Sequence, residues 1–152
     1  MLQIGGYDYH GQTRAATDMK DQQAGETVGM ILSTAEKLQK PVCIWIVSDG
    51  SVTSADSMQA GGGWTGDSGG HGVAYLIMYS PTAAPATNGY QIGYFNDNQS
   101  ADPGFVTGDN PELATAAAFA NYLRFAGKFS LFDSIVGRSF NSLQLDEILK
   151  VG

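Results

Sequence analysis

The sequence predicts a single α/β domain over residues 1–152, in which a mixed β-sheet is flanked by helices. Two apolar runs, VCIWIV, which is rich in β-branched residues, and VAYLIMYS, have the length and flanking turn residues of buried strands. A helical repeat precedes the first run, and two further helical patterns lie near the C-terminus. A chain of this length is long enough to bury one sizeable core.

The N-terminal third predicts a strand, a turn and a helix. Residues 2–5 form a short apolar run that stops at two glycines, so they are expected to be a strand. The helix is expected over residues 18–39, where apolar residues recur at steps of three and four, and Pro41 ends it. Its apolar face consists of Ala24, Val28, Ile31, Ala35 and Leu38.

The two central strands are expected at residues 42–47 and 73–79, both buried. Residues 50–72 are rich in Gly, Ser and Asp and predict a long loop. Because this stretch contains no crossover helix, the two strands are expected to be adjacent and antiparallel. Beyond them we expect a strand at 90–95 and helices at 112–126 and 143–149, the former opened by Pro111 and Glu112.

Charge and composition exclude several classes of partner. Eight basic and fifteen acidic residues give a net charge of −7, and no Lys/Arg cluster suits nucleic acid. No apolar run approaches a membrane span, and the N-terminus lacks the pattern of a signal peptide, so a soluble protein is expected. Cys43 is the single cysteine, which excludes a disulfide framework and indicates a buried strand thiol.

Residues able to bind a metal lie next to the predicted strands. Asp8 and His10 follow the first strand, Asp49 follows the second, and His71 precedes the third. If the strands at 42–47 and 73–79 are antiparallel, all four residues share one edge of the sheet. Carboxylate and imidazole ligands of this kind suit zinc or manganese.

Three motifs in order resemble a known family. GGYDYHGQ, IWIVSDGSVTS and DSGGHGVAYLIM are similar in order and spacing to the C-terminal half of a family of uncharacterised, sulfatase-like bacterial proteins in the alkaline phosphatase superfamily. That family carries a Gly-Gly-aromatic-Asp-x-His turn, a strand that ends in Ser-Glu-Phe-Gly and a Gly-rich Asp/His loop. The match covers about residues 4–80, and it implies part of an alkaline-phosphatase-like fold.

The resemblance implies metal-dependent hydrolysis of phosphate or sulfate esters. It makes Asp8 and His10 ligands of one metal, Asp49 the acidic residue after the central strand, and His71 the histidine of the last loop. Gly50 stands where superfamily phosphatases often place a histidine, and the half that supplies their nucleophile has no counterpart here. We therefore expect a missing N-terminal half, partial or no metal occupancy in the purified protein, and no turnover by this chain alone. Family relatives resemble exported proteins.

Other functions fit parts of the sequence. GDSGG around Ser68 resembles the serine loop of trypsin-like proteases, but the helical content contradicts their two-barrel fold. A serine hydrolase that uses Ser48 or Ser51 with His71 is an alternative, although no Gly-x-Ser-x-Gly motif is present.

A non-catalytic binding or assembly module is the other alternative, with an interface of exposed aromatics at Trp64, Tyr90, Tyr94 and Phe95. The first segment lacks flanking strands, so we expect an exposed sheet edge. Exposed edges are normally paired, covered or blunted, and we therefore expect a homodimer or larger oligomer.

Overall fold

A computed structural model describes residues 5, 14–47, 51–54, 64–68, 74–94, 97, 102–108 and 110–152. For residues 14–17, 51–54, 64–68 and 111 it describes the backbone alone. Helices and strands both occur along the chain, which confirms α/β content. The strand expected at 2–5 lies outside the described residues except for Gly5, which is not in a strand.

The first helix, α1 (Arg14–Leu38), confirms the helix predicted at 18–39 and begins four residues earlier. It ends because Gln39 adopts a left-handed conformation with φ 52°, and the Lys40 N–H then donates to the Ala35 carbonyl at 3.0 Å. This is the usual way in which a helix satisfies its last carbonyls. Pro41 follows and leads into the first strand.

The strands β1 (Val42–Val47) and β4 (Ala74–Tyr79) confirm the two central strands and their antiparallel pairing. In their register Val42 pairs with Tyr79, and Val47 pairs with Ala74. A second antiparallel pair, β2 (Ser51–Ser54) and β3 (Trp64–Ser68), occupies the region predicted as a loop, so that prediction was wrong. Both pairings in the described part are antiparallel, so the mixed sheet predicted from the sequence is not found there.

The prediction that β1 and β4 are both buried was wrong for one end of the sheet. At that end Trp45 is 41 % exposed, Val47 65 % and Tyr75 61 %. The other end is half-buried, from Val42 to Ile44 and from Leu76 to Tyr79. The apolar sequence therefore predicted the strands correctly. It did not predict how much of their side-chain surface other elements bury.

The prediction of a strand at 90–95 was also wrong for residues 90–94, which the structure describes. Residues 90–94 are irregular, because Gly89 and Gly93 take left-handed conformations with φ 80° and 82°. Such dihedrals break an extended strand, and glycine adopts them without strain. The Gln91 side chain donates to the Gly93 carbonyl, and the Tyr94 carbonyl accepts from the Asp102 N–H at 2.8 Å.

The C-terminal helices confirm the last two predictions within about a residue. They are α2 (Pro111–Phe125) and α4 (Ser142–Ile148), joined through the 3-10 helix η2 (Phe129–Leu131) and α3 (Phe132–Val136), which were not predicted. Asn110 caps α2 by accepting from two backbone N–H groups, and Asn141 forms a capping box with Gln144.

The buried core lies in this C-terminal half. Its centre is the set Ala116, Ala117, Ala120, Leu123, Phe132, Phe140 and Ile148. The Phe132 ring packs between those of Phe129 and Phe140, with centroids 5.6 and 5.8 Å away. Among the described residues before Thr107, only Ala35 is buried.

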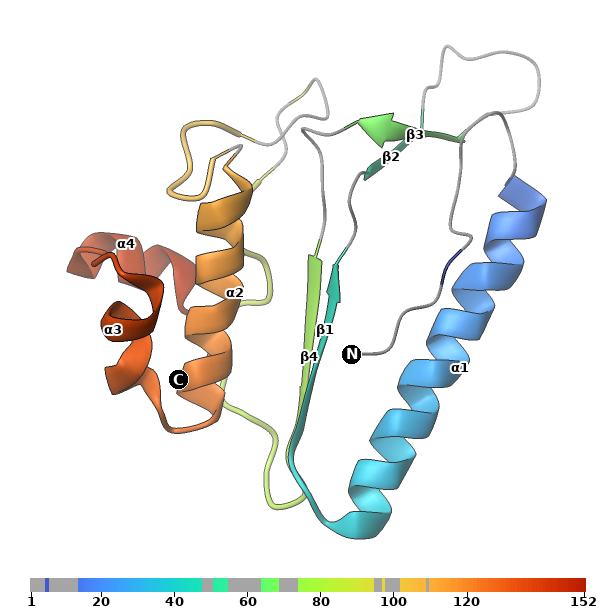
Figure 1. Cartoon of the computed structure of the whole chain (residues 1–152), viewed down its shortest axis with the longest axis horizontal. Coiled ribbons are helices and arrows are strands. Elements are labelled where there is room, and N and C mark those ends of the chain that lie inside the picture. The colour runs from blue at the N-terminus through green and yellow to red at the C-terminus, as the bar shows by residue number, and fades with distance from the viewer. Residues whose placement is uncertain are drawn as a thin grey trace.

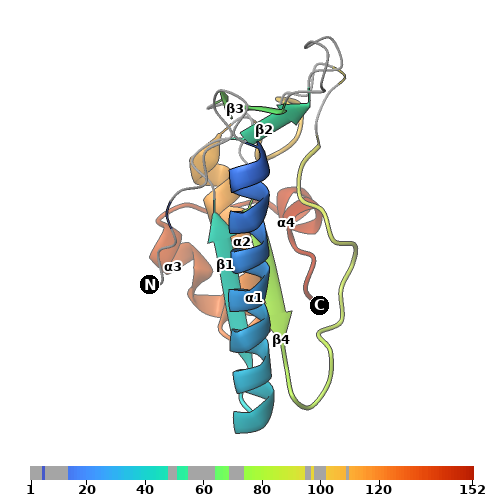
Figure 2. The ribbon, with the colours of Figure 1, turned by 90° about the vertical axis from the view of Figure 1, so that its right-hand side faces the viewer.

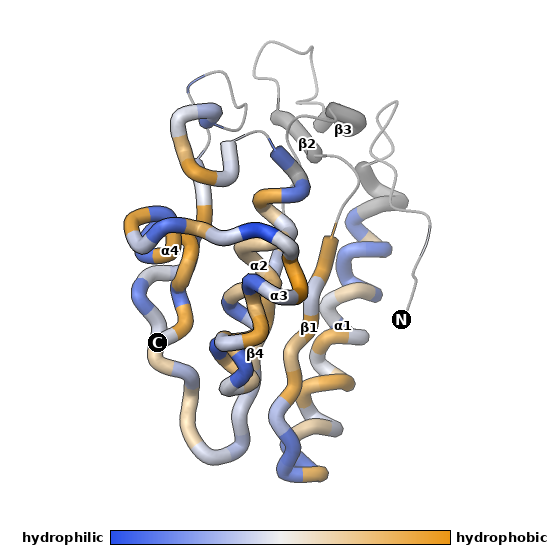
Figure 3. The backbone as a smooth tube through the Cα atoms, turned by 60° about the vertical axis from the view of Figure 1, so that its left-hand side comes forward, coloured by the Kyte–Doolittle hydropathy of each residue, from blue (hydrophilic) through white to orange (hydrophobic). Residues whose placement is uncertain are grey.

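The β1–β4 pair lies between α1 and α2 (Figure 1). In the view turned by 90°, residues 80–94 run on the β4 side of this pair (Figure 2). Apolar stretches colour both β1 and the C-terminal helices in Figure 3, although only the helices bury them fully.

Candidate functional site

The four predicted metal ligands, Asp8, His10, Asp49 and His71, all lie outside the described residues. Among the residues that the structure does describe, no group of three or more His, Cys, Asp or Glu side chains could hold a metal ion.

Two antiparallel ladders flank Asp49 and His71 along the chain. On one side Val47 pairs with Ala74, and on the other side Ser51 pairs with Ser68. Cα atoms of directly opposite residues in such ladders are about 4.5–5.5 Å apart. Only residues 48–50 connect the two ladders on one strand and residues 69–73 on the other. Asp49 is the middle residue of the first connection, and His71 is the middle residue of the second.

The start of α1 lies at the same end of the molecule as β2 and β3 (Figure 1). α1 and β1 are joined by residues 39–41 at the opposite end. A helix of 25 residues is about 37 Å long and a strand of six is about 20 Å, so α1 extends beyond the carboxyl end of β1. His10 and Asp8 precede Arg14 by four and six residues.

The serine residues considered from the sequence differ in what the structure describes. Ser48 lies outside the described residues. Ser51 opens β2 and Ser68 ends β3, and their backbones pair with each other. The pairing shifts register between Ser51 and Thr53, so the ladder is irregular at the end next to residues 48–50.

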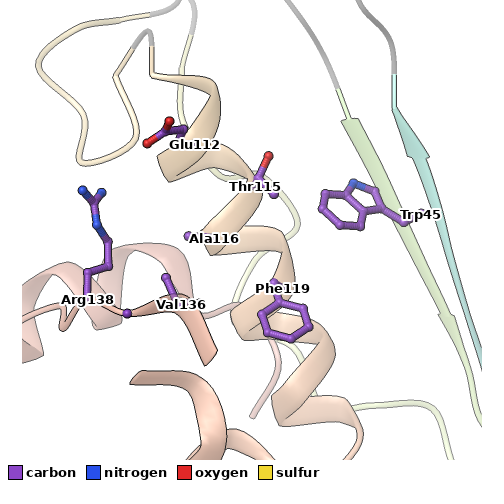
Figure 4. Close-up of a pocket in the computed structure, with 8 residues that line it drawn as sticks. Trp45, Glu112, Thr115, Ala116, Phe119, Val136 and Arg138 are labelled. Atoms are coloured by element: carbon purple, nitrogen blue, oxygen red, sulfur yellow. The ribbon is translucent and has the colours of Figure 1, made fainter. Parts of the chain in front are cut away.

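A separate groove of about 460 Å³ lies between β1 and α2 and reaches the turn after α3 (Figure 4). Trp45 approaches α2 from β1, and Phe119 projects from the middle of α2. Glu112 and Arg138 line the groove and lie across α2 from Trp45 in this view. The full lining is Trp45, Glu112, Thr115, Ala116, Phe119, Val136, Gly137 and Arg138.

The groove combines aromatic surface with two opposite charges. The Phe119 ring stacks on Tyr122 with centroids 6.0 Å apart, which fixes its orientation on α2. Gly137 adopts a left-handed conformation with φ 72° and ends α3, and Arg138 follows it in the lining of the groove. The lining of the groove is mixed, with Trp45, Phe119 and Val136 as apolar parts and Glu112, Thr115 and Arg138 as polar parts. Trp45 was missed from the sequence because it was assigned to a buried strand.

Cys43 lies on β1 next to Met78 in the register and is partly buried. Burial raises the pKa of its thiol above the ordinary value of 9.0, because the thiolate loses solvation. Reactive cysteines have lowered pKa values, so this thiol is not a nucleophile of the activated kind. The sequence prediction of a buried strand thiol was therefore partly right.

The aromatic residues expected at an interface are only partly described. Tyr90 is 92 % exposed and Tyr94 is 60 % exposed. The Tyr94 ring makes an edge-to-face contact with Phe105, with centroids 5.4 Å apart. Trp64 is described in its backbone alone, and Phe95 lies outside the described residues.

Comparisons with protein-family models, curated proteins and solved structures found no match to this chain. In the part of the chain that the structure describes, no helix has both the length and the apolar character needed to cross a bilayer.

Proposed function

We propose that this chain is a metal-binding domain of the phosphate and sulfate ester hydrolase class, with zinc or manganese bound by Asp8, His10, Asp49 and His71. The motifs that resemble the alkaline phosphatase superfamily are its first support. We further propose that the chain has no turnover alone, because that resemblance provides no counterpart of the superfamily nucleophile.

The observation that carries the proposal is the pair of ladders on either side of Asp49 and His71. Val47 pairs with Ala74, and Ser51 pairs with Ser68. The two connections, residues 48–50 and 69–73, therefore join the same two ladders. A chain spans at most about 3.3–3.6 Å per residue, so the short length of each connection limits how far Asp49 and His71 can lie from these paired ends. This favours a site shared by a carboxylate from one connection and an imidazole from the other.

The position of the α1 start supports the other two ligands. It lies at the end of the molecule where β1 leads into β2, and His10 is only four residues away along the chain (Figure 1). Two histidines and two carboxylates would give zinc its preferred four ligands, with bonds of about 2.0–2.2 Å. A bound divalent ion would polarise an ester oxygen and stabilise the charge that develops on it.

Thermal unfolding with added metal tests the proposal, using protein without a histidine tag. A ligand at about 100 times its Kd stabilises the folded state by about 2.7 kcal/mol, which for a chain of this size raises Tm by roughly 5–10 °C. The variants His10→Ala and His71→Ala should each lose most of this shift. Asp133→Ala is the matched control, because Asp133 is an exposed carboxylate on α3 and should leave the shift unchanged.

Activity assays separate metal binding from turnover. We expect negligible hydrolysis of a generic aryl phosphate or aryl sulfate by the metal-loaded chain. Hydrolysis that His71→Ala abolishes would show that the chain needs no further part. If neither zinc nor manganese shifts Tm, the metal proposal is wrong, and the non-catalytic binding or assembly module takes its place.

The exposed apolar end of the β1–β4 sheet favours that second candidate. Trp45, Val47 and Tyr75 project from a sheet whose described edges are open, which suits contact with another polypeptide. Sedimentation equilibrium tests this candidate, and a monomer at every concentration would contradict assembly with a second copy.

A further inference from the structure

Asn88 is the one asparagine of the chain that a glycine follows. In an Asn-Gly pair the backbone nitrogen of the glycine can attack the side-chain carbonyl carbon of the asparagine, which is the first step of deamidation. Glycine has no Cβ, so it hinders this approach least and leaves the main-chain angles most free. The pair is therefore chemically reactive, and the surrounding structure decides whether the reaction takes place.

The structure holds the Asn88–Gly89 pair in an exposed and irregular segment. Both residues are exposed, and neither belongs to a helix or a strand. Gly89 has a φ of 80°, and a Cβ built on it would meet no heavy atom of the described residues within 4 Å. The next residue, Tyr90, is 92 % exposed. Segments of this kind open locally at little cost in free energy, so the two reacting atoms can reach the geometry of attack.

Three other asparagines are followed by residues that oppose the reaction. Pro111 follows Asn110, and proline has no backbone N–H that could lose a proton and attack. Asn96 and Asn98 are each followed by a residue with a side chain, which hinders the approach more than glycine does. Their sequence alone therefore makes them less reactive than Asn88.

The last two asparagines are held by the C-terminal helices. Asn121 is 2 % exposed, and its amide group donates to the Ala117 carbonyl and accepts from the Lys150 N–H. The Asn141 side chain caps α4 by accepting from the Gln144 N–H at 2.9 Å. These hydrogen bonds must break before either side chain can turn toward the following backbone nitrogen.

We propose that Asn88 is a site of spontaneous deamidation in the folded chain, with isoaspartate as the main product. The Gly89 nitrogen forms a bond to the Asn88 Cγ, the Cγ–Nδ2 bond breaks, and the side-chain nitrogen leaves as ammonia with the proton of the Gly89 N–H. Water then opens the cyclic imide at one of its two carbonyl carbons. Opening at Cγ gives aspartate, and opening at the backbone carbon gives isoaspartate. The proposal does not depend on the metal site.

The modification falls where two distant parts of the chain are joined. Thr87 forms an antiparallel bridge with Val151, and the Asn88 N–H donates to the Lys150 carbonyl at 2.7 Å. Either product adds one negative charge to a chain whose net charge is −7. Isoaspartate also lengthens the main chain by one methylene, directly after the bridge. Deamidation thus changes both the charge and the main chain beside the C-terminal segment.

Mass spectrometry of the incubated full chain tests the proposal. The chain and a synthetic peptide of residues 84–92 are kept at neutral and at mildly alkaline pH, and fragmentation of the main chain distinguishes isoaspartate from aspartate. We expect Asn88 in the folded chain to deamidate within about tenfold of the rate in the peptide, because local opening that costs less than about 1.4 kcal/mol slows the reaction no further. The rate should rise with pH, since the Gly89 nitrogen attacks after it loses its proton.

The variant Asn88→Gln is the matched control. Its longer side chain would have to close a six-membered imide, which forms much more slowly, so residue 88 should stay unmodified. Deamidation of Asn88 more than about tenfold slower than in the peptide would overturn the proposal. A faster reaction at any other asparagine, or aspartate without isoaspartate at residue 88, would overturn it as well.

Discussion

The C-terminal helices and the N-terminal α1–β1–β4 layer use similarly apolar sequences with different results. In the helices, small residues on α2 such as Ala117 and Ala120 are fully buried against Phe132 and Ile148. In the layer, large residues such as Trp45 and Val47 stay exposed, and Ala35 is the only buried side chain described. The difference shows that burial depends on how many elements pack around a segment. In the described part of the chain, too few elements pack on the β1–β4 sheet to bury its large side chains.

The C-terminal helices are also held together by one polar side chain. The Asn121 amide is 2 % exposed and donates to the carbonyls of Ala117 and Ile148, both at 2.8 Å. Its oxygen accepts from the N–H groups of Lys150 and Val151, at 2.7 and 3.1 Å. Each donor and acceptor of the amide is thus used, and the C-terminal segment is fixed to α2.

The largest effect expected from this comparison is that of Phe132→Ala. Phe132 is 2 % exposed and packs on two other aromatic rings, so its removal should lower the free energy of unfolding by about 3–5 kcal/mol. Its neighbour Leu131 is 46 % exposed, and Leu131→Ala should cost about 1 kcal/mol or less. Urea unfolding of both variants measures this, and equal losses would contradict the position of the core.

A smaller effect is expected for Asn121→Ala, which removes four hydrogen bonds and leaves buried backbone groups of Ile148 and Val151 without a partner. We expect a loss of about 2–4 kcal/mol. Hydrogen exchange should localise the change, with faster exchange at residues 148–152 than in β1 and β4. Uniformly faster exchange throughout the chain would show that the two regions unfold as one unit.

The smallest effect concerns Cys43 in the N-terminal layer. Because burial raises its folded-state pKa above 9.0, the thiol contributes stability that is fully present below that pH. This contribution is lost as pH rises through the folded-state pKa. The Tm of the parent chain relative to Cys43→Ser should therefore be constant near neutral pH and fall above about pH 9. A thiolate absorbance titration with its midpoint at or below 9.0 would contradict the partial burial of this residue.

The sequence predicted the elements with strong local signals. Helical periodicity located α1 and α2, and Pro41 and Pro111 marked where helices end or begin. The strands β2 and β3 were missed because SVTS and WTGDS are polar and lack the alternation of a half-buried strand. The strand at 90–95 was predicted from aromatic and β-branched residues, while two left-handed glycines decided the structure.

The site could be predicted only in part for similar reasons. The antiparallel relation of β1 and β4 followed from the absence of a helix between them, and the structure confirms it. The roles of Asn121 and Trp45 depend on contacts with residues distant in sequence, and no local pattern marks them. The ligand assignment of Asp8, His10, Asp49 and His71 stays a prediction, since all four lie outside the described residues.

Calorimetric titration of the untagged chain with zinc tests the central claim, that a carboxylate and a histidine from the two connections between the ladders share one metal. We expect one zinc per chain, a strong loss of affinity in Asp49→Asn and in His71→Ala, and unchanged binding in the control Asp133→Asn. Absence of binding by the parent chain, or binding that survives both Asp49→Asn and His71→Ala, would contradict it.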